Sequence, residues 1–440
     1  MKQNNMATQP VFPLLLKMSL PPMLSMLIQS LYNIVDSMYV AYLGEDALTA
    51  ISLAYPLQNL SLALAVGLGI GVNALIARNL GANDHERVNV IASNGLVMTL
   101  CHSLLFVVIG LFVTAPFFQL FTDSASVYQG AIVYGRIVLI CAIGQHMHLF
   151  VEKMFQATGN MIIPMLLQLV GACINLILDP ILIFGYFGMP ALGIMGAAIA
   201  TVTGQICTAL LAIYLLHKKQ KNIHFNRTYI KIENIKLIYS ITIPSSIMLA
   251  LPSLLISILN ALLATFSQTA VAFFGIYYKL QTFIYMPSSG IIQGMRPLVA
   301  YNYGAKEYER VHKIIHTAVA CIGSVLCLGT CLFLFFPTFI LSMFNANQAM
   351  YDIGINGLRI LSIGFICSTL GFGLSGVFEA LGKGIYSMIV SFCRQFFITI
   401  VIAFVGSYFF GVTAIWVAFI VAEICGSIVA FAFYKHLHLK

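Results

Sequence analysis

Long uninterrupted apolar runs are the feature that most restricts the fold of this 440-residue chain. Twelve runs are each long enough to cross a bilayer as a helix, which takes about 20 residues. A bilayer interior accepts only helices and closed barrels, and barrel strands would be short segments of alternating polarity. The expected spans are 14–42, 48–77, 90–113, 126–157, 161–185, 191–216, 235–265, 271–302, 311–338, 353–381, 385–410 and 412–434.

Composition agrees with a membrane location. Only 8% of the residues are charged and the mean hydropathy is +0.95, whereas a soluble chain carries about a quarter charged residues. We therefore expect an all-α polytopic membrane protein with twelve transmembrane helices, whose main surroundings are the lipid bilayer.

The basic residues gather in alternate connections between the spans. The connections after even-numbered spans hold Lys and Arg, whereas the others hold neither and carry acids: Glu45, Asp46, Asp123 and Asp352. By the positive-inside rule, both termini and the long connection after the sixth span are cytoplasmic. This placement accounts for most of the net charge of +8, so we expect no nucleic-acid partner.

The ten cysteines lie almost all inside apolar runs, and none has the spacing of metal ligands. We expect them to be small buried side chains rather than disulfides or metal ligands. The sequence also lacks a nucleotide-binding loop, a nucleophile elbow and a zinc motif. We therefore expect a protein that is not an enzyme and holds no cofactor.

The chain repeats itself at a distance of 223 residues. RNLGANDHERV at 78–88 matches YNYGAKEYERV at 301–311. We expect two six-helix lobes with the same topology, 1–220 and 234–440, joined by a basic cytoplasmic linker at 221–233. A parallel repeat of this kind is typical of alternating-access transporters, which handle their substrate between the two lobes.

Four polar residues interrupt apolar runs in the first lobe: Asp36, Asn175, Asp179 and Thr201. An acid at the centre of a transmembrane helix costs about 2.5–3.5 kcal/mol, so its presence needs a reason. At 1.5 Å per residue, all four lie about 9–15 Å below the outer edge of the membrane. Two neighbouring carboxylates resist carrying two negative charges in a low dielectric, so the pair can take up a proton or a sodium ion. We interpret these residues as a coupling site for H⁺ or Na⁺, and the sequence does not distinguish the two ions.

The alternative is a structural hydrogen-bond cluster that holds three helices together. The repeat provides an internal comparison, because the second lobe has aliphatic residues at the positions of the two acids and the amide: Leu259, Ile398 and Ile402. The fold alone does not require polar groups there, which favours the coupling site.

Other charged residues also fall within spans. Glu152 lies one turn from His148 and either lines a central cavity or extends to the cytoplasmic surface. We expect Glu379, near the inner end of its span, to face water, and Arg394 is a candidate partner for Glu423. The abundant methionine and aromatic residues would suit an apolar, adaptable cavity, although lipid contact explains most of them.

Five stretches resemble the multidrug and toxic compound extrusion (MATE) family. They are SLPPMLSMLIQSLYNIVDSMYVAYLGEDALTAIS at 19–52, the paired NLGA and NYGA motifs, and INLILDPILIF followed by GIMGAAIAT. Within the family the chain is most similar to the MepA-like branch. Pro252 stands where the NorM-like branch has a glutamate, so we expect no second-lobe sodium site of that kind.

The resemblance implies two helix bundles forming a V, and export of organic cations and other amphiphilic drugs driven by uptake of H⁺ or Na⁺. It implies an ion-coupling site, able to hold Na⁺ by its oxygen atoms, at Asp36, Asn175, Asp179 and Thr201, with Thr203 as the alternative to Thr201. It implies cavity-lining or helix-bending roles for Pro21, Gln29 and Tyr32. We place Glu152 in the same substrate cavity.

We therefore expect a secondary-active multidrug exporter of the cytoplasmic membrane that works as a monomer. An exporter or flippase of a lipid-linked or native metabolite on the same plan remains an alternative. An intramembrane enzyme or receptor would need another explanation for Asp36 and Asp179. A major facilitator carrier is disfavoured, because GANDHERVN stands where its GxxxDRxGR-type loop is expected.

Overall fold

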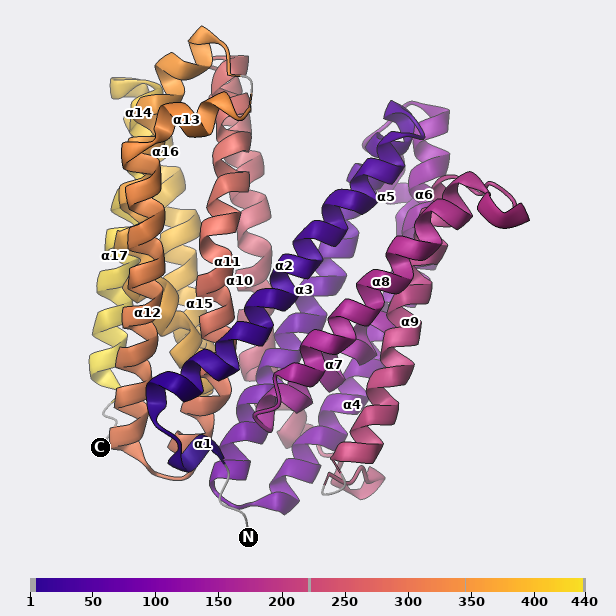
Figure 1. Cartoon of the computed structure of the whole chain (residues 1–440), viewed down its shortest axis with the longest axis vertical. Coiled ribbons are helices and arrows are strands. Elements are labelled where there is room, and N and C mark those ends of the chain that lie inside the picture. The colour runs from indigo at the N-terminus through magenta and orange to yellow at the C-terminus, as the bar shows by residue number, and fades with distance from the viewer. Residues whose placement is uncertain (1–4, 221–222, 345, 438–440) are drawn as a thin grey trace. The chain divides into compact units, whose positions relative to one another are not determined.

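The computed structural model describes residues 5–220, 223–344 and 346–437, and within that part of the chain it contains helices and no strand (Figure 1). Residues 221 and 222 of the expected linker lie outside the described residues. The long segments are α2 (Val11–Ala41), α3 (Glu45–Gly81), α4 with η1 and α5 (His85–Val108, Ile109–Val113, Thr114–Gln119), α6 with α7 (Ala125–Ile140, Ile143–Ala157), α8 (Ile162–Phe184), α9 (Ile194–Lys219), α10 (Ile232–Ala264), α11 (Gln268–Gly304), α12 (Tyr308–Phe335), α14 (Gln348–Ala380), α15 with η4 and α16 (Gly384–Phe392, Cys393–Phe397, Ile398–Phe410) and α17 (Val412–His436). The short helices are α1 (Asn5–Thr8), η2 (Tyr186–Gly188), η3 (Arg227–Tyr229) and α13 (Pro337–Ser342).

The expected spans coincide with these long segments to within six residues at each end. Among the described residues, ten helices are long and apolar enough to cross a membrane. The pair α6 and α7, bent by 44°, adds an eleventh if it counts as one span. The remaining long segment is α11, which carries Lys279 and Arg296 within its length. The predicted all-α membrane fold is confirmed.

Local side chains explain where several helices begin and end. Asp84, Ser124 and Ser267 each accept a hydrogen bond from the backbone N–H three residues later, which caps α4, α6 and α11. Gly185 ends α8 in the left-handed conformation, at φ +77°. The end of α8 therefore lies just beyond the polar residues at 175–179.

The chain forms two compact units. One unit contains the chain up to Met23 together with Ile247 onward, and the other contains Leu24–Ser246. Helices α2 and α10 each contribute their first part to one unit and their remainder to the other. The boundaries of these units differ from those of the two lobes expected from the repeat, 1–220 and 234–440. The lobes stay a prediction from the sequence.

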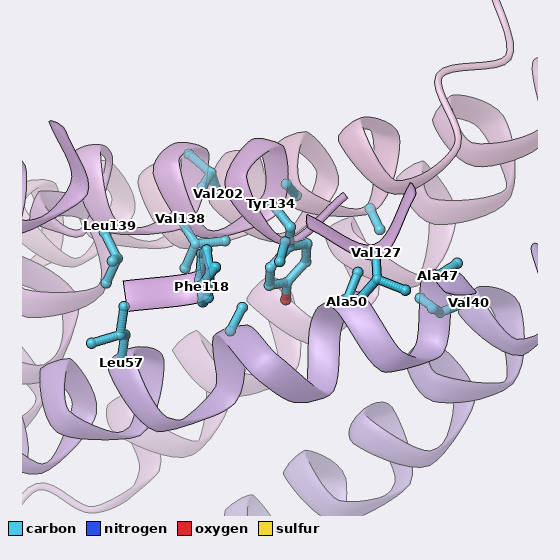
Figure 2. Packing of buried hydrophobic residues seen from close by; sticks show 14 of the residues in the cluster. Val40, Ala47, Ala50, Leu57, Phe118, Val127, Tyr134, Val138, Leu139 and Val202 are labelled. Carbon is cyan, nitrogen blue, oxygen red and sulfur yellow. The ribbon is translucent and has the colours of Figure 1, made fainter. Parts of the chain in front are cut away.

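The core of the unit Leu24–Ser246 is built from α3 packed against α6 and α9 (Figure 2). Alanines at 47, 50 and 54 recur at helical spacing on α3 and are buried. Their small side chains let α6 approach, and Val127, Tyr134 and Val138 pack against them. This packing brings the hydroxyl-bearing Tyr134 of α6 into an apolar core.

Two expectations about charged residues have different outcomes in the other unit. Arg394 and Glu423 form the predicted ion pair, with Nε–Oε2 and Nη2–Oε1 distances of 2.5 and 3.1 Å. The expectation that Glu379 faces water is wrong. Glu379 is fully buried and pairs with Arg296 on α11 at 2.5 Å. A carboxylate can be buried in this way because an opposite charge compensates it.

The cysteines are all unpaired, as expected. The expectation that they are buried is wrong, because five are exposed on the surface of the protein and five are partly exposed. A thiol side chain is apolar enough to lie on a surface that faces lipid.

Candidate functional site

The four predicted coupling residues meet in the unit Leu24–Ser246. Asp179 is fully buried on α8, and Asn175 lies one turn before it on the same helix. With its amide oriented to satisfy both neighbours, Asn175 donates from its nitrogen to Asp179 Oδ2 at 2.7 Å and accepts from Thr201 Oγ1 at 3.3 Å. Asp36 of α2 completes the cluster, because its carboxyl group lies within hydrogen-bonding reach of Asp179.

Close packing of α8 against α9 allows these contacts. A Cβ atom at Gly196 would overlap the backbone carbonyl of Leu182, and one at Gly204 would lie 3.5 Å from the Cβ of Asn175. Only glycine permits that approach at Gly196. Thr201, between these two glycines on α9, is thereby held against Asn175.

The geometry of the two carboxyl groups favours an ion between them. Two carboxylates within hydrogen-bonding reach repel each other unless a proton or a cation is shared. Within the described part of the chain, Asp36 Oδ1 is buried and has no hydrogen-bond partner, a costly state for an acceptor. A proton would satisfy it, and so would Na⁺ held by carboxylate, amide and hydroxyl oxygens.

Transition-metal chemistry has no comparable support. Over the residues that the structure describes, no group of three or more His, Cys, Asp or Glu side chains is arranged to hold a metal ion.

Two further residues of this cluster were not predicted from the sequence. The hydroxyl of Tyr134 of α6 lies near Thr201 and near Gln58 of α3, and the hydroxyl of Tyr32 of α2 also lies near Thr201. Tyr32 was among the expected cavity residues, whereas Tyr134 and Gln58 were not. Neither carries a charge, and tyrosine is common in membrane helices, so nothing in the sequence marked them.

A cavity of about 350 Å³ opens beside the cluster, within the same unit. Its wall includes the expected Gln29 and Tyr32, together with Asp36, Asn175 and Thr201. Eight carboxamide side chains lie in the wall: Gln29, Asn33, Gln58, Asn59, Gln145, Gln168, Asn175 and Gln205. No methionine or phenylalanine lines this cavity, whereas three tyrosines do: Tyr32, Tyr55 and Tyr134.

The other predicted site residues lie elsewhere. Pro21 belongs to the other compact unit. Glu152 is buried behind the cavity wall, with its Oε2 4.0 Å from Nε2 of the wall residue His148 and its Oε1 2.9 Å from Nζ of Lys153. Thr203 is absent from the wall, so Thr201 is the threonine that contacts Asn175.

Comparison with known proteins supports the predicted resemblance. The family model described as MatE matches residues 21–181 and 244–405, and the two matches begin 223 residues apart, as the repeat does. "Probable multidrug resistance protein YoeA" of Bacillus subtilis (strain 168) is 27% identical over 435 residues, covering 96% of this chain and 92% of the relative. "Multidrug export protein MepA" of Staphylococcus aureus (strain N315) is 27% identical over 428 residues, covering 94% and 92%.

Solved structures agree at the level of the fold. An outward-facing "multidrug resistance MATE family transporter of the MOP superfamily" matches with a TM-score of 0.90 at 23% identity, covering 99% of this chain and 98% of that one. A "MOP superfamily transporter from Pyrococcus furiosus Vc1 (DSM3638)" matches with the same score, identity and coverage. The two copies of the family model span most of the sequence, and the chain therefore belongs to the MatE family of multi-pass membrane transporters.

Proposed function

We propose that this transporter exports organic cations and other amphiphilic drugs across the cytoplasmic membrane, in exchange for H⁺ or Na⁺. The names of the relatives, a multidrug resistance protein and a multidrug export protein, support this substrate class. The observation that carries the proposal is the proximity of Asp36, which is partly buried, to Asp179, which is fully buried beside Asn175 and Thr201.

In this mechanism the driving ion binds between Asp36 and Asp179. Binding removes their repulsion, and release restores it. Asp36 lies on α2, and the first part of that helix belongs to the other compact unit. Pro21 and Pro22, which favour bending of a helix, lie at this boundary. A change of charge at Asp36 thus alters the packing of a helix that both units share, and this biases alternating access.

The cavity beside the ion site receives the drug. Gln29 and Tyr32 contact the drug from α2, and Glu152 lies behind the cavity wall, beside His148 and paired with Lys153. The driving ion and a cationic drug in the adjoining cavity then bind alternately. Each adds positive charge to the region, and each therefore lowers the affinity of the protein for the other. The transporter works as a monomer, with both termini and the basic connection at 221–233 in the cytoplasm.

The test is transport of tetraphenylphosphonium by the purified protein in proteoliposomes, with either a pH gradient or a Na⁺ gradient imposed. The proposal expects uphill movement of this cation with one gradient and none without a gradient. Absence of uphill movement with both gradients, in vesicles that contain correctly folded protein, would refute it.

The carboxamide-lined wall favours a second candidate, export of a polar native metabolite or lipid-linked precursor. Eight amide side chains can donate and accept hydrogen bonds to a neutral hydroxylated molecule. This candidate predicts that a hydroxyl-rich neutral solute, such as a disaccharide, inhibits tetraphenylphosphonium transport competitively. If a disaccharide at millimolar concentration does not inhibit this transport, soluble sugars are excluded as substrates.

A further inference from the structure

A second charged cluster lies next to the cavity and involves a lysine that the proposed mechanism does not use. Lys153 Nζ donates to Glu152 Oε1 at 2.9 Å and to Gln156 Oε1 at 3.1 Å. The Gln156 amide in turn donates to Glu152 Oε1 at 2.8 Å. All three residues are more than nine-tenths buried on α7. His148, one turn before Glu152, separates this cluster from the cavity.

The surroundings of Lys153 are built to accommodate it. A Cβ atom at Gly69 of α3 would lie 2.5 Å from Lys153 Cγ, so the glycine leaves a slot for the lysine stem. In the second copy of the repeat, 223 residues later, the large and the small residue of this pair have changed places. Gly376 of α14 replaces Lys153, and its missing side chain makes room for Ile292 of α11, the counterpart of Gly69.

The charges are also arranged differently in the two copies. In the second copy, Arg296 of α11 pairs with Glu379 of α14, so the ion pair joins two helices. The counterparts in the first copy are Asn73 and Gln156, both neutral. The Asn73 amide donates to the backbone oxygen of Lys153 at 3.0 Å. In the first copy the opposite charges instead sit side by side on α7.

A pair on one helix does not clamp two helices together, so its purpose differs from that of Arg296 and Glu379. What the pair does is cancel a negative charge that would otherwise face the cavity through His148. An exporter that binds a cation must also release it, and an uncompensated buried carboxylate beside the cavity would oppose release.

We propose that Lys153 is the built-in counter-cation of Glu152 and sets the affinity of the cavity for organic cations. With Lys153 in place, a monovalent organic cation in the cavity meets a neutral pair and binds reversibly. Without it, the same ligand meets a net negative charge and binds more tightly. This inference rests on the proposed function only in taking an organic cation as the ligand.

The test is equilibrium binding of tetraphenylphosphonium to the purified full-length protein in detergent. The local charge is zero in the wild type, −1 in Lys153→Met, +1 in Glu152→Gln and zero in the double variant. A unit charge about 12 Å from the ligand changes affinity about tenfold at an effective dielectric constant near 20. We expect Lys153→Met to bind about tenfold tighter than wild type, Glu152→Gln about tenfold weaker, and the double variant like wild type.

The controls separate charge from structure. Lys153→Arg keeps the charge and should bind like wild type, and Lys218→Met removes an exposed lysine from the end of α9 with no effect. The neutral probe triphenylphosphine oxide should bind all variants equally. Should Lys153→Met fail to fold because Glu152 is left uncompensated, the comparison of Glu152→Gln with the double variant still decides the result.

Two results would overturn the inference. One is an affinity for tetraphenylphosphonium that does not follow the order of local charge, and the other is an equal response of the neutral probe. Failure of the proposed function is distinguishable, because it would show as no transport of tetraphenylphosphonium by wild-type protein with either gradient.

Discussion

Replacing Arg394 by Met should destabilise the unit that contains α14 and α17 by about 3–5 kcal/mol. Arg394 lies in η4 and makes two hydrogen bonds to the carboxylate of Glu423 on α17. Both side chains are buried, so the substitution leaves a carboxylate in the interior without an opposite charge, and that situation costs about 3–5 kcal/mol. Methionine can follow the path of the arginine stem past Gly426, where a Cβ would lie 2.7 Å from Arg394 Cγ. Packing loss is therefore small, and the cost is electrostatic.

The assay is equilibrium unfolding of purified protein in mixed micelles. It compares the wild type, Arg394→Met, Glu423→Gln and the double variant. The double variant carries no buried charge at this pair and should recover most of the loss, since a buried ion pair can be replaced by neutral groups at little cost. Unfolding free energies of Arg394→Met within about 1 kcal/mol of wild type would refute this reasoning. So would a double variant as unstable as the single one.

Three further predictions concern the other unit. Asp36→Asn and Asp179→Asn should each abolish drug resistance in a sensitised host while the amount of membrane protein stays unchanged on immunoblots; full resistance with either would contradict the ion site. Gly69→Ala should lower stability by about 1–3 kcal/mol, because its Cβ would overlap the stem of Lys153; thermal unfolding in detergent measures this, and an unchanged midpoint would show that the slot is not needed. Tyr134→Phe removes the hydroxyl that lies near Thr201 and should cost about 0.5–1.5 kcal/mol in the same assay, and a loss several times larger would mean that the ring packing has changed.

Hydrophobic segments predict the helices of this chain well. In a bilayer the backbone must satisfy its own hydrogen bonds, so a long apolar run can hardly be anything but a helix. The interruptions within spans were not predicted. The break between α6 and α7 and the π-helical turns η1 and η4 depend on packing against neighbouring helices, and hydropathy does not record packing.

The meeting of the four polar residues could be predicted because depth along a straight helix follows from residue number. That rule brought Asp36, Asn175, Asp179 and Thr201 to one level, and the structure shows their contacts. The rule does not say in which direction a side chain points from its helix axis. It therefore did not predict that Tyr134 of α6 joins the cluster.

Partners of buried charges were harder to predict. Glu379 was expected in water because it lies near a helix end, yet Arg296 from another helix compensates it inside the protein. Lys153 falls near the inner end of the expected span 126–157, and its buried position shows only in the packing against Gly69. Depth alone cannot distinguish an acid that reaches water from one that meets a cation on a neighbouring helix.

The central claim is that the driving ion binds between Asp36 and Asp179. The most direct measurement compares two activities of reconstituted wild type, Asp36→Asn and Asp179→Asn: uphill tetraphenylphosphonium transport on the driving gradient, and gradient-free exchange of labelled for unlabelled tetraphenylphosphonium. Asp352→Asn, at an exposed acid on α14, serves as the matched control. The account predicts that both site variants lose uphill transport and keep measurable exchange, whereas Asp352→Asn keeps both. Uphill transport at wild-type rates in either site variant would contradict it.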